Sequence, residues 1–525
     1  MKSVSIFNHV LGPVMRGPSS SHTAGAFHIA GMARSLLAGT PRRAVFAFDP
    51  AGSYAATYVK QGADRGFAMG LMAKPLTDES FFTALDDAPQ AGLEIEFEIR
   101  QLANPDHPNA VEIDLAAPDG ASLRLVARSI GGGEVEFTHV DDRPVLFNGS
   151  AYETLLEVPA EKAESAKALL AGDNQSFDDP VATHEDGFVR LTARRKAALS
   201  ASFREELRAL DDDARIWQST PVYFLQQGEP LFSSAAEMLQ VAAQHNASLG
   251  RTALAYEAQL LGLSEDEVLA ETLRRYDVMV QSVERGLDPE FTGLQLLPAS
   301  AGAIFNAEAD GRLSVRSLHT RAAARAMAVM HVDGAMGVVC AAPTGGSAGV
   351  IPGTLVTLAE ERSLTREQIA LALLAAGSIG MILAIRGTFA AEVAGCQVEI
   401  GASGAMAAAA VVDAVGGTAQ QASDAAAISF QNTMGTVCDL LHGMVEIPCH
   451  TRNAAAAASA FVNADLILGG YTNYIPLDET IDAVYAVGLA MPAELRCTSK
   501  GGLAVTPSAQ SLKVLCCQSG CSSCR

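Results

Sequence analysis

Apolar and polar residues alternate in short segments over the first 150 residues, and Asp, Gly and Pro separate these segments. Alternation of this kind is typical of β-strands with one buried face. Residues 24–37 instead carry apolar side chains at helical spacing. Strands are expected at residues 44–48, 93–99, 111–115, 123–129 and 135–137. The pattern therefore predicts an α/β domain over residues 1–150.

A shorter alternation of strands and helices follows this domain. The polar stretch 172–185 within it is expected to be an exposed loop. The expected elements are strands at 152–158, 187–193 and 215–224, with helices at 160–170 and 200–210. This order predicts a small α/β module over residues 151–225, of the ferredoxin-like kind.

From residue 226 onward, apolar residues recur at the three-to-four spacing of helices. Ser264 and Glu267 have the spacing of a capping box, which indicates that a helix starts there. Helices are expected at residues 233–248, 251–261, 265–284, 320–330 and 365–374. The predicted fold class is thus multidomain α/β plus mainly α, with a helical domain over 226–510 and a Cys-rich tail over 511–525.

The composition of the 525 residues, 49% apolar and 18% charged, is typical of a well-packed soluble protein. A formal net charge of −22 repels phosphate backbones, so nucleic-acid binding is not expected. No window reaches 18 uninterrupted apolar residues, and the first residues do not resemble a signal peptide. We therefore expect a cytoplasmic protein that does not bind a membrane.

The nine cysteines all lie at or after residue 340, and four of them lie in the last ten residues. This distribution favours metal or redox chemistry in the C-terminal half over a disulfide framework. Cys396, Cys438 and Cys449 are spaced too widely for a zinc knuckle. Three such thiolates could hold three irons of a cubane cluster, although ferredoxin cysteines are closer together. Their spacing alone leaves the question open.

Two loops carry hydroxyl groups suited to a small ligand. Residues 19–23 read Ser-Ser-Ser-His-Thr before a helix, where hydroxyls and free N–H groups can bind a carboxylate or phosphate. His22 could exchange a proton near neutral pH. In the Gly-rich loop 340–353, Thr344 and Ser347 offer hydroxyls beside Gly346. A helix cap and a buried glycine turn are the alternative interpretations of these loops.

Five motifs occur in one order along the chain: GPVM-x-GPSSSHTAG, C-x-x-PT-x-GSAGV-x-PG, GCQ-x-E-x-G, VCD…G-x-VE-x-PC-x-x-RNA and GGLA-x-TP. Together they resemble the iron–sulfur L-serine dehydratases across nearly the whole chain. The first 150 residues resemble the β domain of that family, and the residues from about 230 onward resemble its α domain. The intervening module sits where some relatives carry an ACT domain, but no clear ACT signature is present.

The resemblance implies a 4Fe–4S cluster held by Cys396, Cys438 and Cys449, with a fourth iron that acts as a Lewis acid. It implies β-elimination of L-serine to pyruvate and ammonia without pyridoxal phosphate, and a homodimer. The two loops would hold the substrate's carboxylate and amino group, and Asn453 would support them. The candidate residues are His22, Ser20 and Lys60 for catalysis, and Ser19, Ser20, Ser21, His22, Thr23, Thr344, Gly346, Ser347 and Asn453 for substrate binding.

Four positions depart from the family pattern. Gln61 stands where a His is expected and cannot act as a base, Arg386 adds a charge before the first ligand Cys, Leu440 replaces a Pro, and Cys497 replaces a Glu. Two alternatives therefore stay open. The chain could be a lyase for another β-substituted amino acid, such as cysteine, threonine or a β-hydroxy dicarboxylate, or a non-catalytic iron–sulfur sensor or carrier.

The tail suggests one further hypothesis about the cluster. Cys524 or Cys521 could bind the open iron and be displaced by substrate, whereas a reactive, disordered terminus is the simpler interpretation.

Overall fold

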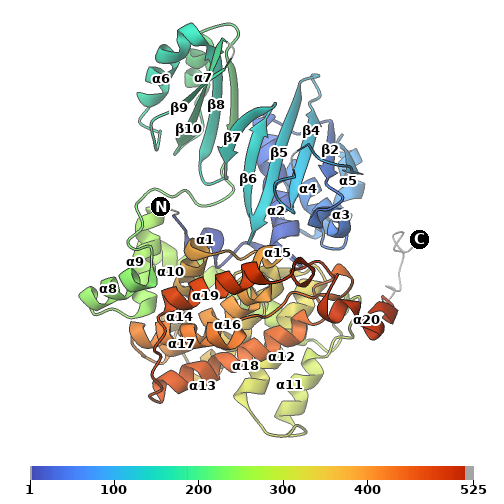
Figure 1. Ribbon diagram of the computed structural model, residues 1–525, viewed down its shortest axis with the longest axis vertical. Helices are drawn as coiled ribbons and strands as arrows, with labels where there is room; N and C mark the ends of the chain where they lie inside the picture. The colour runs from blue at the N-terminus through green and yellow to red at the C-terminus, as the bar shows by residue number, and fades with distance from the viewer. Residues whose placement is uncertain (1–2, 104, 186, 515–525) are drawn as a thin grey trace.

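The computed structural model describes residues 3–103, 105–185 and 187–514. Figure 1 shows a large sheet and a small α/β module above a body of helices. The chain is thus mixed α/β, as predicted. The cysteines at 521 and 524 lie outside the described residues, so the tail hypothesis stays a prediction.

The large sheet has six strands in the order β3-β2-β4-β5-β6-β7, and only the β2–β3 pair is parallel. Helices α2 (Gly25–Leu36) and α4 (Ala63–Leu71) bury their apolar faces against it, around Phe46, Phe67 and Phe137. The strands are β2 (Arg43–Phe48), β3 (Glu94–Ile99), β4 (Ala110–Ala116), β5 (Ser122–Gly131), β6 (Glu134–Val140) and β7 (Arg143–Phe147). The short helices α3 (Ser53–Thr57) and α5 (Ala84–Gln90) lie between β2 and β3 in the chain.

The small module has the element order β-α-β-β-α-β, which is that of ferredoxin-like modules. Its four strands are all antiparallel, in the order β11-β8-β10-β9. The elements are β8 (Tyr152–Pro159), α6 (Ala163–Ala171), β9 (Val181–Glu185), β10 (Phe188–Arg195), α7 (Ala201–Arg208) and β11 (Arg215–Ser219).

The prediction of a loop over the whole of residues 172–185 was wrong at its end. Residues 181–185 form strand β9, which pairs with β10 at the edge of the module's sheet. Residues 181–184 are exposed, so this edge strand lacks the alternation of apolar residues by which a half-buried strand is recognised.

The helical body is built around α16 (Ile400–Ala414), in which all 15 residues are buried. Its Ala and Gly side chains let α14, α17 and α18 pack closely against it. The capping box of Ser264 and Glu267 is present at the start of α10, as predicted. The other main helices are α8 (Ala235–His245), α9 (Leu249–Leu261), α10 (Glu265–Leu287), α11 (Ala301–Ala309), α12 (Leu318–Gly334), α13 (Val350–Arg362), α14 (Arg366–Arg386), α17 (Ala419–Thr433), α18 (Cys449–Leu468) and α19 (Leu477–Ala490).

The first described residues pack into the helical body and not onto the large sheet. Strand β1 (Val14–Arg16) pairs with β12 (Val338–Cys340), and α1 (Ile6–His9) packs against α14. The buried carboxylate of Glu257 accepts hydrogen bonds from the N–H groups of Ile6 (2.8 Å) and Phe7 (2.9 Å). This strand and these bonds bring the Ser-rich loop, which follows β1, close to the helices.

Among the described helices, α14 is the one that is long and apolar enough to cross a membrane. Its most apolar window is 83% buried inside the protein, which is typical of a core helix.

Candidate metal centre and active site

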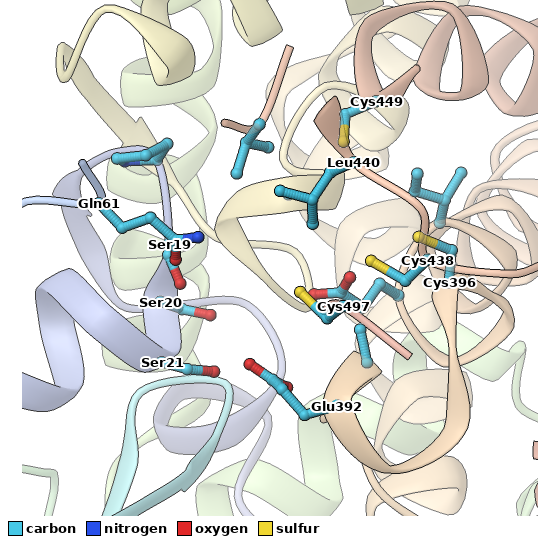
Figure 2. Close-up of a pocket in the computed structure, with 16 residues that line it drawn as sticks. Ser19, Ser20, Ser21, Gln61, Glu392, Cys396, Cys438, Leu440, Cys449 and Cys497 are labelled. Atoms are coloured by element: carbon cyan, nitrogen blue, oxygen red, sulfur yellow. The ribbon is translucent and has the colours of Figure 1, made fainter. Parts of the chain in front are cut away.

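Four cysteines from separate segments line one cavity between the helical body and the Ser-rich loop (Figure 2). Cys396 begins a 3₁₀ turn before α16, and Cys449 is the first residue of α18. Cys438 lies in the connection between α17 and α18, and Cys497 lies beyond α19. The Sγ atoms of Cys396 and Cys438 and a carboxylate oxygen of Glu399 all lie within 4.8 Å of one another.

The donor set of this cavity suits an iron–sulfur cluster. Cys396, Cys438 and Cys449 are all buried, and soft thiolates shielded from water are the ligands that such clusters take. A hydrogen bond with Cys438, together with burial, raises the pKa of Cys396 well above its usual range, and burial does the same for Cys449. A metal must therefore displace protons from these thiols when it binds.

Arg452 places a positive charge beside these thiols. Its Nη1 lies 4.0 Å from the Sγ of Cys396 and donates to the carbonyl of Val437 at 2.7 Å. Its Nη2 pairs with Asp439 Oδ1 at 2.8 Å. The pKa values of Cys396 and Cys449 are raised overall, and the charge of Arg452 offsets part of that rise. Sequence reasoning did not single out Arg452, although it begins the Arg-Asn-Ala part of the fourth motif, three residues after Cys449.

Ser19, Ser20 and Ser21 line the side of the cavity opposite the cysteines (Figure 2). Their loop turns directly into α2, and Ser19 Oγ accepts a hydrogen bond from the N–H of His22 at 3.1 Å. Thr23 does not line the cavity. Its Oγ1 donates to the carbonyl of Gln61 at 2.6 Å, which fixes the loop to the neighbouring segment.

His22 is buried behind the serines and does not line the cavity. Its Nδ1 lies 3.1 Å from Ser19 Oγ and its Nε2 lies 3.0 Å from Ser53 Oγ. Burial lowers the pKa of His22 to about 3, so the ring is neutral at physiological pH. His22 therefore reaches the cavity only through the hydroxyl of Ser19.

Asn453 joins the Gly-rich loop to the start of α18. Its Nδ2 donates to the carbonyls of Gly346 and Cys449, both at 2.9 Å, and its Oδ1 accepts from the N–H of Gly349 at 3.2 Å. Gly346 lines the cavity, whereas Thr344 and Ser347 do not. The hydroxyls of Thr344 and Ser347 lie 3.0 Å apart and fix the turn of the loop.

Two carboxyl groups that sequence reasoning missed also line the cavity, Glu392 and Glu399. Burial raises the pKa of Glu399 to about 8, and the nearby Glu392 adds to this effect. Glu399 is the Glu of the GCQ-x-E-x-G motif, so its spacing from Cys396 was an available signal. Glu392 lies before the motif, and no sequence pattern identifies it.

A larger pocket of about 620 Å³ opens beside the cavity and shares Glu392 and Cys497 with it. Lys60 lines this pocket and not the cavity, and its Nζ donates to the carbonyl of His442 at 3.2 Å. Arg496 and Lys500 line the pocket as well. The volume is within the range of small-molecule sites, and the three cationic side chains would attract an anionic ligand.

Three of the four departures from the family pattern lie at the cavity: Gln61, Leu440 and Cys497. The side-chain Nε2 of Gln61 donates to the carbonyl of Gly443 at 3.0 Å. Arg386 does not line the cavity and is bound by Asp482, to which its Nε donates at 2.8 Å. The added charge of Arg386 therefore does not reach the cavity.

Residues 209–504 match the family model described as serine dehydratase alpha chain. The chain is 36% identical over 283 residues to a probable L-serine dehydratase alpha chain of Bacillus subtilis (strain 168), covering 54% of this chain and 94% of the relative. It is 34% identical over 284 residues to the L-serine dehydratase alpha chain of Peptoniphilus asaccharolyticus, covering 54% of this chain and 97% of the relative. An L-serine dehydratase of Escherichia coli (strain K12) is 33% identical over 286 residues, and the match covers 52% of this chain and 62% of the relative.

The helices from α8 to α19 and the four cysteines of the cavity thus lie within the matched segment, which covers more than half of the chain. The chain belongs to the iron–sulfur L-serine dehydratase family.

Proposed function

We propose that this protein is a 4Fe–4S-dependent L-serine ammonia-lyase that converts L-serine to pyruvate and ammonia. The observation that carries the proposal is the meeting of three far-separated thiols, Cys396, Cys438 and Cys449, with the Ser-rich loop at one cavity. These three thiols would hold the cluster. When bound, the cluster supplies a Lewis-acidic iron that makes the hydroxyl a better leaving group.

The remaining groups of the cavity would bind and orient the substrate. The hydroxyls of Ser19, Ser20 and Ser21 can donate to the carboxylate, and the turn at Gly346 would hold the amino group. His22 would orient Ser19 through the contact at its Nδ1. The cationic pocket beside the cavity would admit the substrate, with Lys60 at its wall.

Glu399 and Glu392 are suited to proton transfer in this cavity. A carboxyl group whose pKa is raised to about 8 holds its proton at neutral pH and can donate it to the departing hydroxyl. The elimination also breaks the Cα–H bond, so a second group in its deprotonated form must accept that proton as water leaves. The product is 2-aminoacrylate, which tautomerises and hydrolyses to pyruvate and ammonia. The pKa of the half-buried Glu392 is also raised, chiefly by removal of the carboxylate from water, which makes it the second carboxyl to test for a role in proton transfer.

A second candidate function is β-elimination from another amino acid. Gln61, Leu440 and Cys497 all line the cavity and all differ from the family pattern, so they could change which side chain is accepted. Cysteine, threonine and β-hydroxy dicarboxylates are the substrates to compare. A non-catalytic sensor or carrier is the third candidate, which Cys497 favours because it adds a fourth thiol to the cavity.

The test is a substrate panel with anaerobically reconstituted protein, with ammonia and 2-oxo acid measured together. We expect L-serine to give equal amounts of pyruvate and ammonia. Turnover of another β-substituted amino acid in place of L-serine would favour the second candidate, and a cluster-loaded protein that is inert toward all of them would favour the third.

We also propose that the protein is a cytoplasmic homodimer that works in amino-acid degradation and supplies pyruvate for gluconeogenesis. Exposed apolar side chains between α18 and α19, Tyr471, Tyr474 and Ile475, offer a surface for a second copy. Light scattering of the purified protein measures its mass and tests the dimer. We keep the division into domains 1–150, 151–225 and 226–510 as a proposal, which limited proteolysis can test.

A further inference from the structure

Cys497 lies directly beside Cys438 through a short backbone pairing. The N–H of Cys438 donates to the carbonyl of Leu495 at 2.8 Å, and the N–H of Cys497 donates to the carbonyl of Cys438 at 2.9 Å. The two thiols hydrogen-bond to each other. Cys497 also has a φ of 60°, in the left-handed region that favours glycine. The backbone therefore holds this thiol beside Cys438 in a strained conformation.

The position of Cys497 differs from that of the remaining described thiol. Cys340 lies in the hydrophobic core, where its Sγ contacts the carbonyl of Leu11 at 3.5 Å, and it does not line the cavity. Cys497 lines the same cavity as Cys396, Cys438 and Cys449 (Figure 2). Four thiols therefore face one space, whereas the family pattern requires only three.

We propose that Cys497 is a fourth protein ligand of the cluster and binds the iron that Cys396, Cys438 and Cys449 leave open. The inference rests on the proposed cluster but not on the identity of the substrate. As the sulfur–iron bond forms, the thiol loses its proton to solvent, and no electron is transferred.

Cys497 is also placed so that this bond can be reversed. It is the one of these four cysteines that is not fully buried as a residue, and it lines the larger pocket through which we propose that substrate enters. For a substrate hydroxyl to take its place, the Cys497 thiolate would leave the iron and take up a proton. Cys497 would therefore protect the cluster at rest and compete with substrate for the open iron.

The test compares the full-length protein with Cys497→Ala and Cys497→Ser after anaerobic loading with iron and sulfide. Cys340→Ala is the matched control, because it removes a buried thiol outside the cavity. A shortened chain that ends at residue 514 removes the tail cysteines. Iron per chain and the electron paramagnetic resonance spectrum are recorded before and after mild ferricyanide oxidation, which removes an iron that has no protein ligand.

We expect the full-length protein, the Cys340→Ala variant and the shortened chain to keep all four irons. Both Cys497 variants should lose one iron and show the spectrum of a three-iron cluster. Equal iron loss from the full-length protein and from the Cys497 variants would overturn the inference and leave the proposed function intact. Iron loss from the shortened chain but not from the Cys497 variants would assign the ligand to the tail instead. A full-length protein that takes up no cluster would contradict both proposals.

Discussion

The side-chain Nδ2 of Asn453 donates a hydrogen bond to the carbonyl of Gly346 at 2.9 Å, although 107 positions separate the two residues. The same amide donates to the carbonyl of Cys449. One buried side chain therefore fixes a wall of the cavity to one of the three thiols that we assign to the cluster.

Replacing Asn453 with Ala should impair both stability and cluster loading. The change leaves buried carbonyls without a donor, which should cost about 3 kcal/mol and lower the thermal unfolding midpoint. Iron per chain after reconstitution should fall as well, because Cys449 loses its anchor. Asn463→Ala is the control, since Asn463 is buried on the same helix and contacts Asn432 outside the cavity. Equal iron content in the two variants would contradict the role of Asn453.

The neutral ring of His22 predicts how stability depends on pH. Burial lowers the pKa of His22 from 6.5 to about 3, so between these values the unfolded chain binds a proton that the folded chain does not. Stability from this residue is therefore present above pH 6.5 and is lost as the pH falls toward 3. At pH 4 the loss should reach about 3 kcal/mol.

A His22→Gln variant cannot take up this proton. Its thermal unfolding midpoint should fall less between pH 7 and pH 4 than that of the unmodified protein. An identical fall in both proteins would show that His22 titrates normally. His245→Gln, which changes an exposed His on α8, controls for the loss of a histidine as such.

Removing the charge of Arg452 should lower the affinity of the protein for the proposed cluster. Arg452→Met takes away the cation near Cys396 and the partner of Asp439, and changes of this kind typically cost about tenfold or more in metal affinity. Arg452→Lys keeps the charge but not the forked contacts, so it should retain an intermediate amount of iron. Competition with an iron chelator measures the loss. Arg325→Met, which changes a buried Arg that donates to Thr357, should behave like the unmodified protein.

The hydroxyl of Ser20 should contribute to substrate binding more than to cluster assembly. Ser20→Ala removes one donor to a carboxylate, which should raise KM by about tenfold, while iron content stays the same. Steady-state kinetics with L-serine test this. Ser378→Ala changes a buried Ser that bonds within α14, and it should leave KM unchanged. A normal KM in Ser20→Ala would remove Ser20 from the proposed site.

Local patterns in the sequence predicted much of the fold. The capping box at Ser264 and the three-to-four spacing that follows it predicted α10. Both signals depend only on residues that are close together in the sequence. Strand β9 was missed because its residues are exposed. The packing of α1 against α14 was missed because it depends on contacts between residues far apart in the chain, including those of Glu257.

The candidate site was predictable only in part, for a related reason. Cysteine spacing could not show that Cys396 and Cys438 meet, and the resemblance to a family supplied that expectation. Neither the spacing nor the resemblance revealed Glu392, which lines the cavity because of where its short helix α15 (Ala391–Ala394) lies. The location of His22 behind Ser19, and of Lys60 outside the cavity, likewise depends on how the Ser-rich loop meets the helical body.

The central claim is that Cys396, Cys438 and Cys449 hold one cluster. The most direct measurement is iron and acid-labile sulfide per chain after anaerobic reconstitution, for the unmodified protein, for Ala variants of each of the three cysteines and for Cys340→Ala. We predict about four irons and four sulfides per chain in the unmodified protein and in Cys340→Ala, and a large loss of both in each of the other three variants. Full iron and sulfide content in any of those three variants would contradict the account.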